Sequence, residues 1–323
     1  MSSPATGQGF GKLILFGEHA VVYGQMAVVA GLDRGAQALV QAGPSGQPSR
    51  LRLFDSCGVE APHHSQNPND TRLGKAFEAM LALFELDAAS LEVCLTINLP
   101  AGAGLGSSAA LAVALSRALA CYNGLTEVQA APRVEAAVER CETIFHGAAS
   151  GIDQAAALRG GLFGFERLAG APARLTPLVV PEVRVAICQA GASASTAQMV
   201  AAVAALLARE RSLVERVNAV IGEIAREALG ALEAGHWARL GDLMNINHGA
   251  LVSLGVSTME LDRACHVARA AGAPGAKLTG GGGGGCVYAL VPDGAGDVLE
   301  AWQAIGLQGF EVVLGSQAPE VTP

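Results

Sequence analysis

A run of glycine, alanine and serine between residues 100 and 108 is the strongest chemical signal in the sequence. It reads Pro-Ala-Gly-Ala-Gly-Leu-Gly-Ser-Ser and leads into residues 107–122, whose alanine and leucine content predicts a helix. Glycine lets the backbone approach a ligand, and the first turn of a helix offers unpaired N–H groups and a positive dipole end. The run therefore predicts a cradle for nucleotide phosphates. Ser107 or Ser108 could also cap the helix or ligate Mg²⁺ carried by the phosphates.

Three other interpretations of this glycine run are weaker. A plain turn with a serine cap needs fewer glycines. The Walker A pattern fails at the earlier Gly-Lys pair, because Leu13 follows it where Ser or Thr is required. The dinucleotide pattern G-x-G-x-x-G fails because Gly102, Gly104 and Gly106 alternate strictly.

A second glycine cluster contains six consecutive glycines at residues 280–285 and leads into the apolar run 286–290. So many glycines carry a large entropic cost on folding. A flexible linker is one interpretation, but linkers rarely continue directly into an apolar strand. The pattern favours a close-packed loop that faces a ligand.

Charged residues flank the first apolar run of the chain. Lys12 lies at the head of residues 11–17, which predict a buried strand, and lysine is almost never fully buried without a partner. Its alternative is a strand-edge lysine in solvent. Glu18 and His19 end the same run and could face a shared cleft.

Two further carboxylates lie in apolar surroundings. Asp153 precedes the apolar residues 155–158, which makes it a candidate base or lysine partner, with a helix N-cap as the alternative. Glu142 lies on the helix predicted for residues 129–146, and a solvated helix face is its alternative.

Composition narrows the class of protein. The chain has 323 residues, enough for about two domains. It carries 21 basic and 29 acidic residues, a net charge of −8, which disfavours nucleic acid and anionic membranes as partners. The seven cysteines form no C-x-x-C pair, and neither a signal peptide nor a membrane span is visible. We therefore expect a soluble cytoplasmic protein with reduced thiols.

The remaining elements that must position these residues follow from periodicity and turn signals. Residues 55–72 predict a long loop, and a composition shift at 172–181 suggests a domain boundary. Strands followed by segregated helices in both halves predict an α+β (mixed α/β) fold with domains at residues 1–182 and 183–323. Further strands are predicted at 26–31, 36–41, 91–99, 160–165, 183–188, 286–291 and 310–314, and further helices at 196–209, 213–233, 237–255, 259–271 and 296–305.

Four segments together resemble a known family. Residues 12–24, Lys-Leu-Ile-Leu-Phe-Gly-Glu-His-Ala-Val-Val-Tyr-Gly, resemble the opening motif of mevalonate kinases, and residues 100–110 resemble the second motif of the GHMP small-molecule kinase superfamily. Ser-Gly-Ile-Asp at 150–153, after His146-Gly147, resembles the segment with the catalytic aspartate, and residues 277–286 resemble the third motif. Matches also occur at Met244, Asn245 and His248, and at residues 254–257.

The resemblance implies a two-domain GHMP kinase fold with its active site in the interdomain cleft. It implies transfer of the ATP γ-phosphate to the 5-hydroxyl of mevalonate, with Asp153 as base or orienter and Lys12 as its partner. Mg²⁺ would be held by Ser108 and Glu142. The phosphates would lie on Pro100, Gly102, Ala103, Gly104, Leu105, Gly106, Ser107 and Ser108. The acceptor would be bound by Lys12, Glu18, His19, Asp153, Ser195, Thr196 and Gly281.

The chain departs from the family pattern in places. Gly9-Phe10-Gly11 replaces Ala-Pro-Gly, Ala149 replaces a proline, and Gly281 stands where alanine is usual. Ala194 replaces a basic residue, which bears on how the acceptor carboxylate is anchored, because a carboxylate usually seeks a cation.

Several alternatives stay open. The acceptor could be phosphomevalonate, homoserine or a sugar, and decarboxylation of a phosphorylated mevalonate is a related reaction. A non-catalytic nucleotide-binding regulator is the alternative of another class. The implied partners are mevalonate and ATP, with neither nucleic acid nor membrane, and a homodimer is left open.

Overall fold

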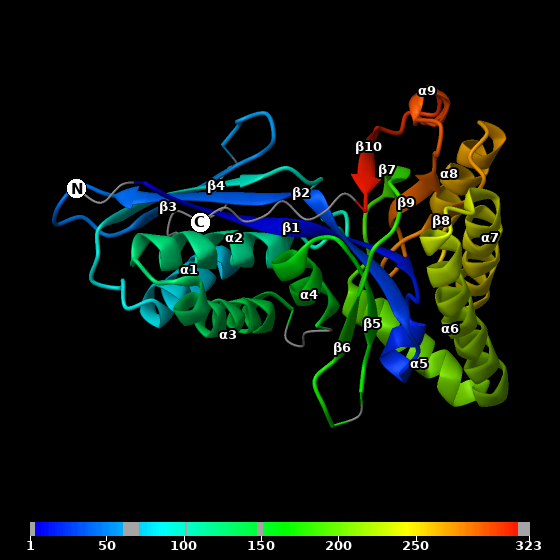
Figure 1. Cartoon of the computed structure of the whole chain (residues 1–323), viewed down its shortest axis with the longest axis horizontal. Helices are drawn as coiled ribbons and strands as arrows, with labels where there is room; N and C mark the ends of the chain where they lie inside the picture. The colour runs from blue at the N-terminus through cyan, green and yellow to red at the C-terminus, as the bar shows by residue number, and fades with distance from the viewer. Residues whose placement is uncertain (1–3, 61–70, 101, 147–150, 169, 316–323) are drawn as a thin grey trace. The chain divides into compact units, whose positions relative to one another are not determined.

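The computed structural model describes residues 4–60, 71–100, 102–146, 151–168 and 170–315, which form a mixed α+β structure (Figure 1). Its strands are β1 (Ala5–Phe16), β2 (Ala27–Ala42), β3 (Arg50–Phe54), β4 (Leu91–Ile97), β5 (Leu162–Glu166), β6 (Arg174–Leu178), β7 (Val183–Gly191), β8 (Ala276–Leu278), β9 (Gly285–Leu290) and β10 (Gly309–Leu314). Its helices are the 3₁₀ turn η1 (Ala20–Tyr23) and α1 (Arg72–Leu83), α2 (Ser107–Tyr122), α3 (Glu127–His146), α4 (Ile152–Arg159), α5 (Thr196–Arg209), α6 (Arg211–Glu233), α7 (Trp237–Ser253), α8 (Met259–Ala270) and α9 (Gly296–Ala304).

The chain divides into two compact units that are not contiguous in sequence. The first unit contains Met1–Lys12, Asp33–Leu99 and Gly106–Arg159, and the second contains Leu13–Leu32, Pro100–Leu105 and Gly160–Pro323. Strands β1 and β2 and the first glycine run each pass from one unit into the other. The division near residue 182 stays a prediction.

The first unit packs helices against a mixed sheet. The second part of β2 pairs antiparallel with β4, and β3 joins β4 in parallel. Helices α1, α2 and α3 lie side by side under these strands in Figure 1. Their contact surfaces form one apolar core, in which Leu95 from the sheet and Val113 and Val138 from the helices are buried.

Glycines on β1 let this strand lie directly against α2. A Cβ on Gly7 would lie 2.2 Å from the carbonyl oxygen of Ala114, and a Cβ on Gly9 would lie 2.1 Å from that of Ala110. Ala110 and Ala114 lie one helical turn apart on the same face of α2. Gly7 and Gly9 lie on the same face of β1, so each glycine meets one of these alanines. The alanine content of α2 thus matches a strand whose facing positions have no side chain.

The second unit contains an antiparallel sheet in the order β10-β7-β9-β8. Helices α6, α7 and α8 pack together beside β8 and β9, as Figure 1 shows. Trp302 of α9 is fully buried in this core, and its indole N–H donates to the carbonyl of Ala264 at 2.9 Å. Strand β5 pairs with the first part of β2 and with β6.

Most elements predicted from periodicity lie close to the observed ones. The helices predicted at 107–122 and 196–209 are confirmed at those bounds. Separate strands at 26–31 and 36–41 were a wrong prediction, since β2 runs without a break through Asp33, Arg34 and Gly35. Glycine at position 35 lets β2 pass close to β1, because a Cβ there would lie 2.0 Å from the carbonyl oxygen of Gly9.

Some elements were not predicted, namely η1, α1, α4, β3, β6 and β8. Ten residues of the expected loop at 55–72, including His63 and His64, lie outside the described residues, as do Ala101 and Ala149. Over the ranges that the structure describes, no helix combines the length and apolar character that crossing a bilayer would require.

The packing of β1 on α2 predicts that Gly9→Ala destabilises the fold. The new methyl group must displace the backbone of α2, so we expect the free energy of unfolding to fall by about 1–3 kcal/mol. Gly230→Ala is the control, because a Cβ there meets nothing within 4 Å and alanine favours the helix α6. Urea unfolding should rank the control above wild type and Gly9→Ala below it; equal stability of the two variants would contradict the close approach.

Candidate active site

Lys12 and Asp153 form an ion pair within the first unit. The Nζ atom of Lys12 lies 2.8 Å from Oδ1 of Asp153, and their side chains are 9% and 30% exposed. Lys12 lies on β1, and Asp153 lies in the first turn of α4, where the helix dipole favours a negative charge. The lysine and the carboxylate that the sequence singled out are therefore in contact.

The N-terminus of α2 lies against this ion pair. Gly106 precedes the helix with φ 75°, and a Cβ there would lie 3.0 Å from Cβ of Lys12 and 3.5 Å from Oδ1 of Asp153. No side chain caps the helix at this position. The first-turn N–H groups and the hydroxyls of the half-buried Ser107 and Ser108 can therefore donate hydrogen bonds to a bound anion.

Glu142 of α3 lies close enough to the pair to interact with its charges. Burial raises the pKa of Glu142 to about 7, the negative charge of Asp153 adds to this rise in pKa, and Lys12 opposes it. A nearby cation would favour the charged carboxylate.

The residues assigned to Mg²⁺ fit this ion chemically. Mg²⁺ prefers hard oxygen ligands and is usually bound by one or two protein groups together with phosphates. The carboxylate of Glu142 and the hydroxyl of Ser108 are such ligands. Across the described ranges, no group of three or more His, Cys, Asp and Glu side chains could hold a metal by itself. These two residues would thus need the phosphates to complete the coordination.

The start of the first glycine run belongs to the second unit, and its exposure alternates. Ala103 and Leu105 are buried, whereas Gly102 and Gly104 are exposed with φ 65° and 77°. A Cβ on either glycine would meet nothing within 4 Å. The buried side chains therefore anchor the loop while the glycine backbone stays open to a ligand.

A second polar cluster lies within the second unit and centres on His19. This residue has φ 61°, a region that costs a non-glycine residue roughly 1–3 kcal/mol and is typical of functional sites. Its Nε2 lies 2.9 Å from the carbonyl oxygen of Gly281, so Nε2 carries the proton and donates. Burial lowers the pKa of His19, which favours the neutral ring.

The third-motif loop packs against the first turn of α5. A Cβ on Gly281 would lie 3.3 Å from Cα of Thr196 and 3.4 Å from its Oγ1. Ser195 and Thr196 are exposed, and Ser195 caps α5 without a side-chain hydrogen bond. The Gly281 carbonyl that binds His19 thus lies near the N-terminus of α5 and its two hydroxyls.

The rest of this glycine loop is closely packed, as the sequence predicted. A Cβ on Gly282 would lie 2.1 Å from the carbonyl oxygen of Val256, and one on Gly284 would lie 2.0 Å from that of Ala192. Gly283 N–H donates to Val256 at 2.7 Å. A flexible linker is excluded.

Sequence reasoning missed the partner of Glu18. This carboxylate forms an ion pair with Lys277, and both side chains are fully buried. The ammonium group also donates to the carbonyl of Leu278 at 2.8 Å and lies 5.3 Å from the ring centre of Tyr288. Lys277 was part of the third motif, but only its position between apolar residues could have indicated a buried partner.

The raised pKa of Glu142 predicts that Glu142→Gln stabilises the ligand-free protein at alkaline pH. The folded state holds its proton up to about pH 7, whereas the unfolded carboxyl releases it near its ordinary value of 4.5. Wild-type stability should therefore decline between these pH values, and the variant should be more stable by an amount on the order of 2 kcal/mol at pH 8 but not at pH 4.5.

Urea unfolding at several pH values measures this difference. Glu139→Gln, on an exposed position of the same helix, should follow wild type. Parallel pH profiles of wild type and Glu142→Gln would show that the carboxylate is not held in an unfavourable setting.

Comparison with known proteins identifies the family of the chain. The GHMP kinases N-terminal domain model matches residues 72–161, and the GHMP kinases C-terminal model matches residues 228–306. Mevalonate kinases of Methanothermobacter thermautotrophicus and Thermococcus gammatolerans are 37% and 34% identical, covering 91% and 90% of this chain and 94% and 90% of theirs. A crystal structure of L. major mevalonate kinase in complex with R-mevalonate superimposes with a TM-score of 0.83 at 29% identity, covering 98% of this chain and all of the other. The chain belongs to the mevalonate kinase family of the GHMP kinases.

Proposed function

We propose that the protein transfers the γ-phosphate of ATP to the 5-hydroxyl of mevalonate, giving 5-phosphomevalonate and ADP. The ion pair of Lys12 and Asp153 at the N-terminus of α2 carries this proposal. Phosphoryl transfer needs a positioned hydroxyl, positive charge and amide donors rather than a covalent intermediate on the protein. The first unit supplies the positive charge of Lys12, the amide donors of α2 and a carboxylate, Asp153, that can orient the acceptor hydroxyl. The mevalonate bound to the L. major relative supports the choice of acceptor.

In the proposed reaction, Asp153 accepts or orients the proton of the acceptor hydroxyl. The hydroxyl oxygen then bonds to the γ-phosphorus, and the bond from that phosphorus to the β,γ-bridging oxygen breaks to release ADP. Lys12 lies 2.8 Å from Asp153, where its charge stabilises both the carboxylate and the alkoxide that develops beside it.

The phosphates of ATP are proposed to lie on the glycine run that ends at Ser108. Open backbone at Gly102 and Gly104 and the uncapped start of α2 support this placement. Mg²⁺, held there by Ser108 and Glu142, would neutralise part of the triphosphate charge.

The acceptor is proposed to bind at the His19 cluster with Ser195, Thr196 and Gly281. Glu18, which the resemblance also assigned to the acceptor, is fully buried against Lys277 and would support the cluster without touching the acceptor. The neighbouring position that usually holds a basic residue is Ala194, so the acceptor carboxylate needs another anchor. The N–H groups of the first turn of α5 and the two exposed hydroxyls can supply it.

The proposal includes small-molecule partners only and a cytoplasmic site of action. All seven cysteines are free thiols, as expected of a reducing compartment. The net charge of −8 disfavours binding to nucleic acid. The proposed domains are residues 1–182 and 183–323.

Acceptor identity is tested by ADP release with mevalonate, phosphomevalonate, homoserine and galactose, with product masses measured. We expect turnover of mevalonate to exceed that of the other three acceptors, because relatives 37% and 34% identical are mevalonate kinases. Preference for another acceptor would overturn the substrate, and ATP binding without any turnover would favour the regulator.

Replacing Lys12 or Asp153 should strongly slow phosphoryl transfer but leave ATP binding largely intact. We expect Lys12→Met and Asp153→Asn each to lower kcat by about 10²–10⁴-fold, because proton transfer and charge stabilisation are lost. Calorimetric titration should show that ATP affinity is largely retained. The exposed Lys75→Met and Asp87→Asn are matched controls of the same unit and should keep wild-type kcat. Near-normal turnover of a pair variant would remove that residue from the mechanism.

A further inference from the structure

Strand β8 lies at the edge of its sheet, and its backbone groups alternate in direction. The sheet order places β9 on one side only. Leu290 N–H donates to Gly275 at 2.9 Å, and Thr279 N–H donates to Cys286 at 3.1 Å, so the backbone of residues 275, 277 and 279 faces β9. The N–H and C=O groups of Ala276 and Leu278 therefore point away from the sheet. Unpaired edge groups of this kind need other partners.

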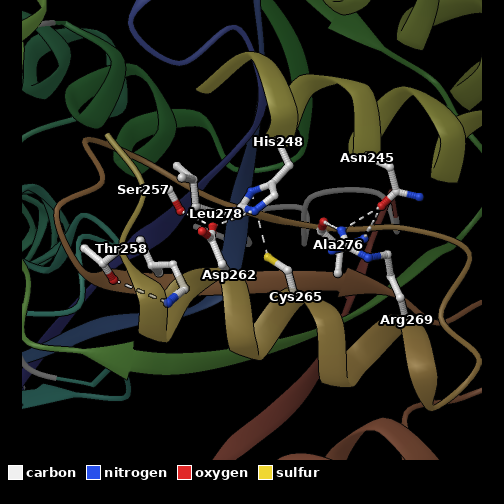
Figure 2. A network of polar contacts seen from close by, with 10 residues as sticks. Asn245, His248, Ser257, Thr258, Asp262, Cys265, Arg269, Ala276 and Leu278 are labelled. Atoms are coloured by element: carbon white, nitrogen blue, oxygen red, sulfur yellow. Dashed lines mark hydrogen bonds and ion pairs between the residues drawn. The ribbon is translucent and has the colours of Figure 1, made fainter. Parts of the chain in front are cut away.

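Side chains of α7 and α8 meet the outward groups of Ala276, as Figure 2 shows. Oδ1 of Asn245 accepts from Ala276 N–H at 3.3 Å. The guanidinium of Arg269 donates to the carbonyl of Ala276 and to Oδ1 of Asn245, both at 3.1 Å. Asn245 also donates to the carbonyl of Pro274 at 3.0 Å, so its orientation is defined.

The outward groups of Leu278 also have side-chain partners, one from α7 and one from β8 itself. Nδ1 of His248 lies 3.4 Å from Leu278 N–H, and Lys277 Nζ donates to its carbonyl at 2.8 Å. Nε2 of His248 lies 3.1 Å from Oδ1 of Asp262, which also accepts from Ser257 at 2.5 Å (Figure 2). The four outward groups of β8 thus have side-chain partners where a fifth strand would otherwise pair.

The surroundings of His248 define one protonation state. Nδ1 faces Leu278 N–H and, at 3.9 Å, the thiol of Cys265, both of which can donate, so Nδ1 accepts; Nε2 faces the carboxylate of Asp262 and carries the proton. Burial lowers the pKa of His248, the charges of Lys277 and Arg269 lower it further, and Asp262 opposes them. A second proton would place Nδ1–H against Leu278 N–H and break the contact with β8.

Strand β8 connects this network to the proposed acceptor site. Lys277, at its centre, holds Glu18 next to His19. After Leu278 the chain enters the glycine loop, where the carbonyl of Gly281 accepts from His19 at 2.9 Å. A displacement of β8 would therefore alter the carbonyl that His19 contacts and the ion pair of the neighbouring Glu18.

We propose that α7 and α8 replace a missing strand for β8, and that His248 is a positioning residue for the acceptor site through its Nδ1 contact with Leu278 N–H. Its kinetic consequence rests on the proposed function. The residue touches neither substrate nor the reacting atoms, so its effect is expected in acceptor affinity rather than in chemistry.

Two conservative variants separate the two ring contacts. His248→Asn keeps an acceptor near the place of Nδ1 and loses the contact with Asp262, whereas His248→Gln keeps a donor near Nε2 and loses the acceptor for Leu278. We expect His248→Gln to raise KM for mevalonate about 3–10-fold, the effect of one hydrogen bond, with a smaller change in kcat. His248→Asn should retain most of the wild-type KM. Equal KM values for the two variants would overturn the proposal.

Trp302→Phe is the stability control for the same unit. It removes the buried hydrogen bond to Ala264 of α8 and none of the side-chain hydrogen bonds to β8 described above. We expect it to lower the melting temperature and to leave KM for mevalonate unchanged. If it raised KM as much as His248→Gln, loss of stability alone would explain the effect, and the positioning role would be rejected.

Two measurements stand apart from catalysis. Amide hydrogen exchange of peptides covering residues 275–286 should be faster in His248→Gln than in His248→Asn or Trp302→Phe; equal exchange would contradict the proposal. In wild type, ¹⁵N NMR of labelled histidine should show His248 neutral with the proton on Nε2, and the opposite tautomer would overturn it without any variant. If wild type fails to phosphorylate mevalonate, the proposed function fails, while exchange and NMR still decide the role of His248.

Discussion

A charged side chain can lie inside a protein only where an opposite charge and hydrogen bonds replace water. Both polar clusters of this chain obey that constraint. Lys12 is held by Asp153 in the first unit, and Lys277 is held by Glu18 in the second. Removing one member of a buried pair costs roughly 3–5 kcal/mol, because the remaining charge is left without compensation. Each ion pair therefore anchors one of the two polar clusters within its own unit.

The two pairs differ in what else surrounds them. The first is partly open at Asp153 and has an additional buried carboxylate, Glu142, whose pKa is raised by burial. This excess of negative groups over Lys12 is the setting in which a divalent cation with phosphates is stabilising. The second pair is fully enclosed and balanced, with Lys277 also near an aromatic ring. It links Glu18, the neighbour of His19 in the chain, to strand β8.

Local sequence patterns were sufficient to predict the long helices. The other elements depend on tertiary contacts that such patterns do not show. Alanine and leucine runs bounded by turn residues predicted α2 and α5 at their observed bounds. Strand β2 could not be predicted as one element, because Asp33-Arg34-Gly35 reads as a turn in the sequence, and only the structure shows that Gly35 lies in an extended strand against the carbonyl of Gly9. The residues of the candidate site were predicted from their chemical types and from the motifs that contain them. The contact of Glu18 with Lys277 spans 259 positions and leaves no local signal, and β8, with three residues, is too short for any periodicity.

The glycine run at 280–285 limits how this loop can vary in sequence. Five of its six residues have positive φ, and Gly281 is the exception. It is also the position where alanine is usual in the motif that this segment resembles. A methyl group at Gly281 would meet Thr196 at a tight but adjustable distance, whereas side chains elsewhere in the run would force strained backbone. Gly281 is therefore the position of this run at which natural or laboratory evolution can introduce a side chain at least cost. It is also the position at which replacing glycine can stabilise the fold by lowering the entropy of the unfolded chain.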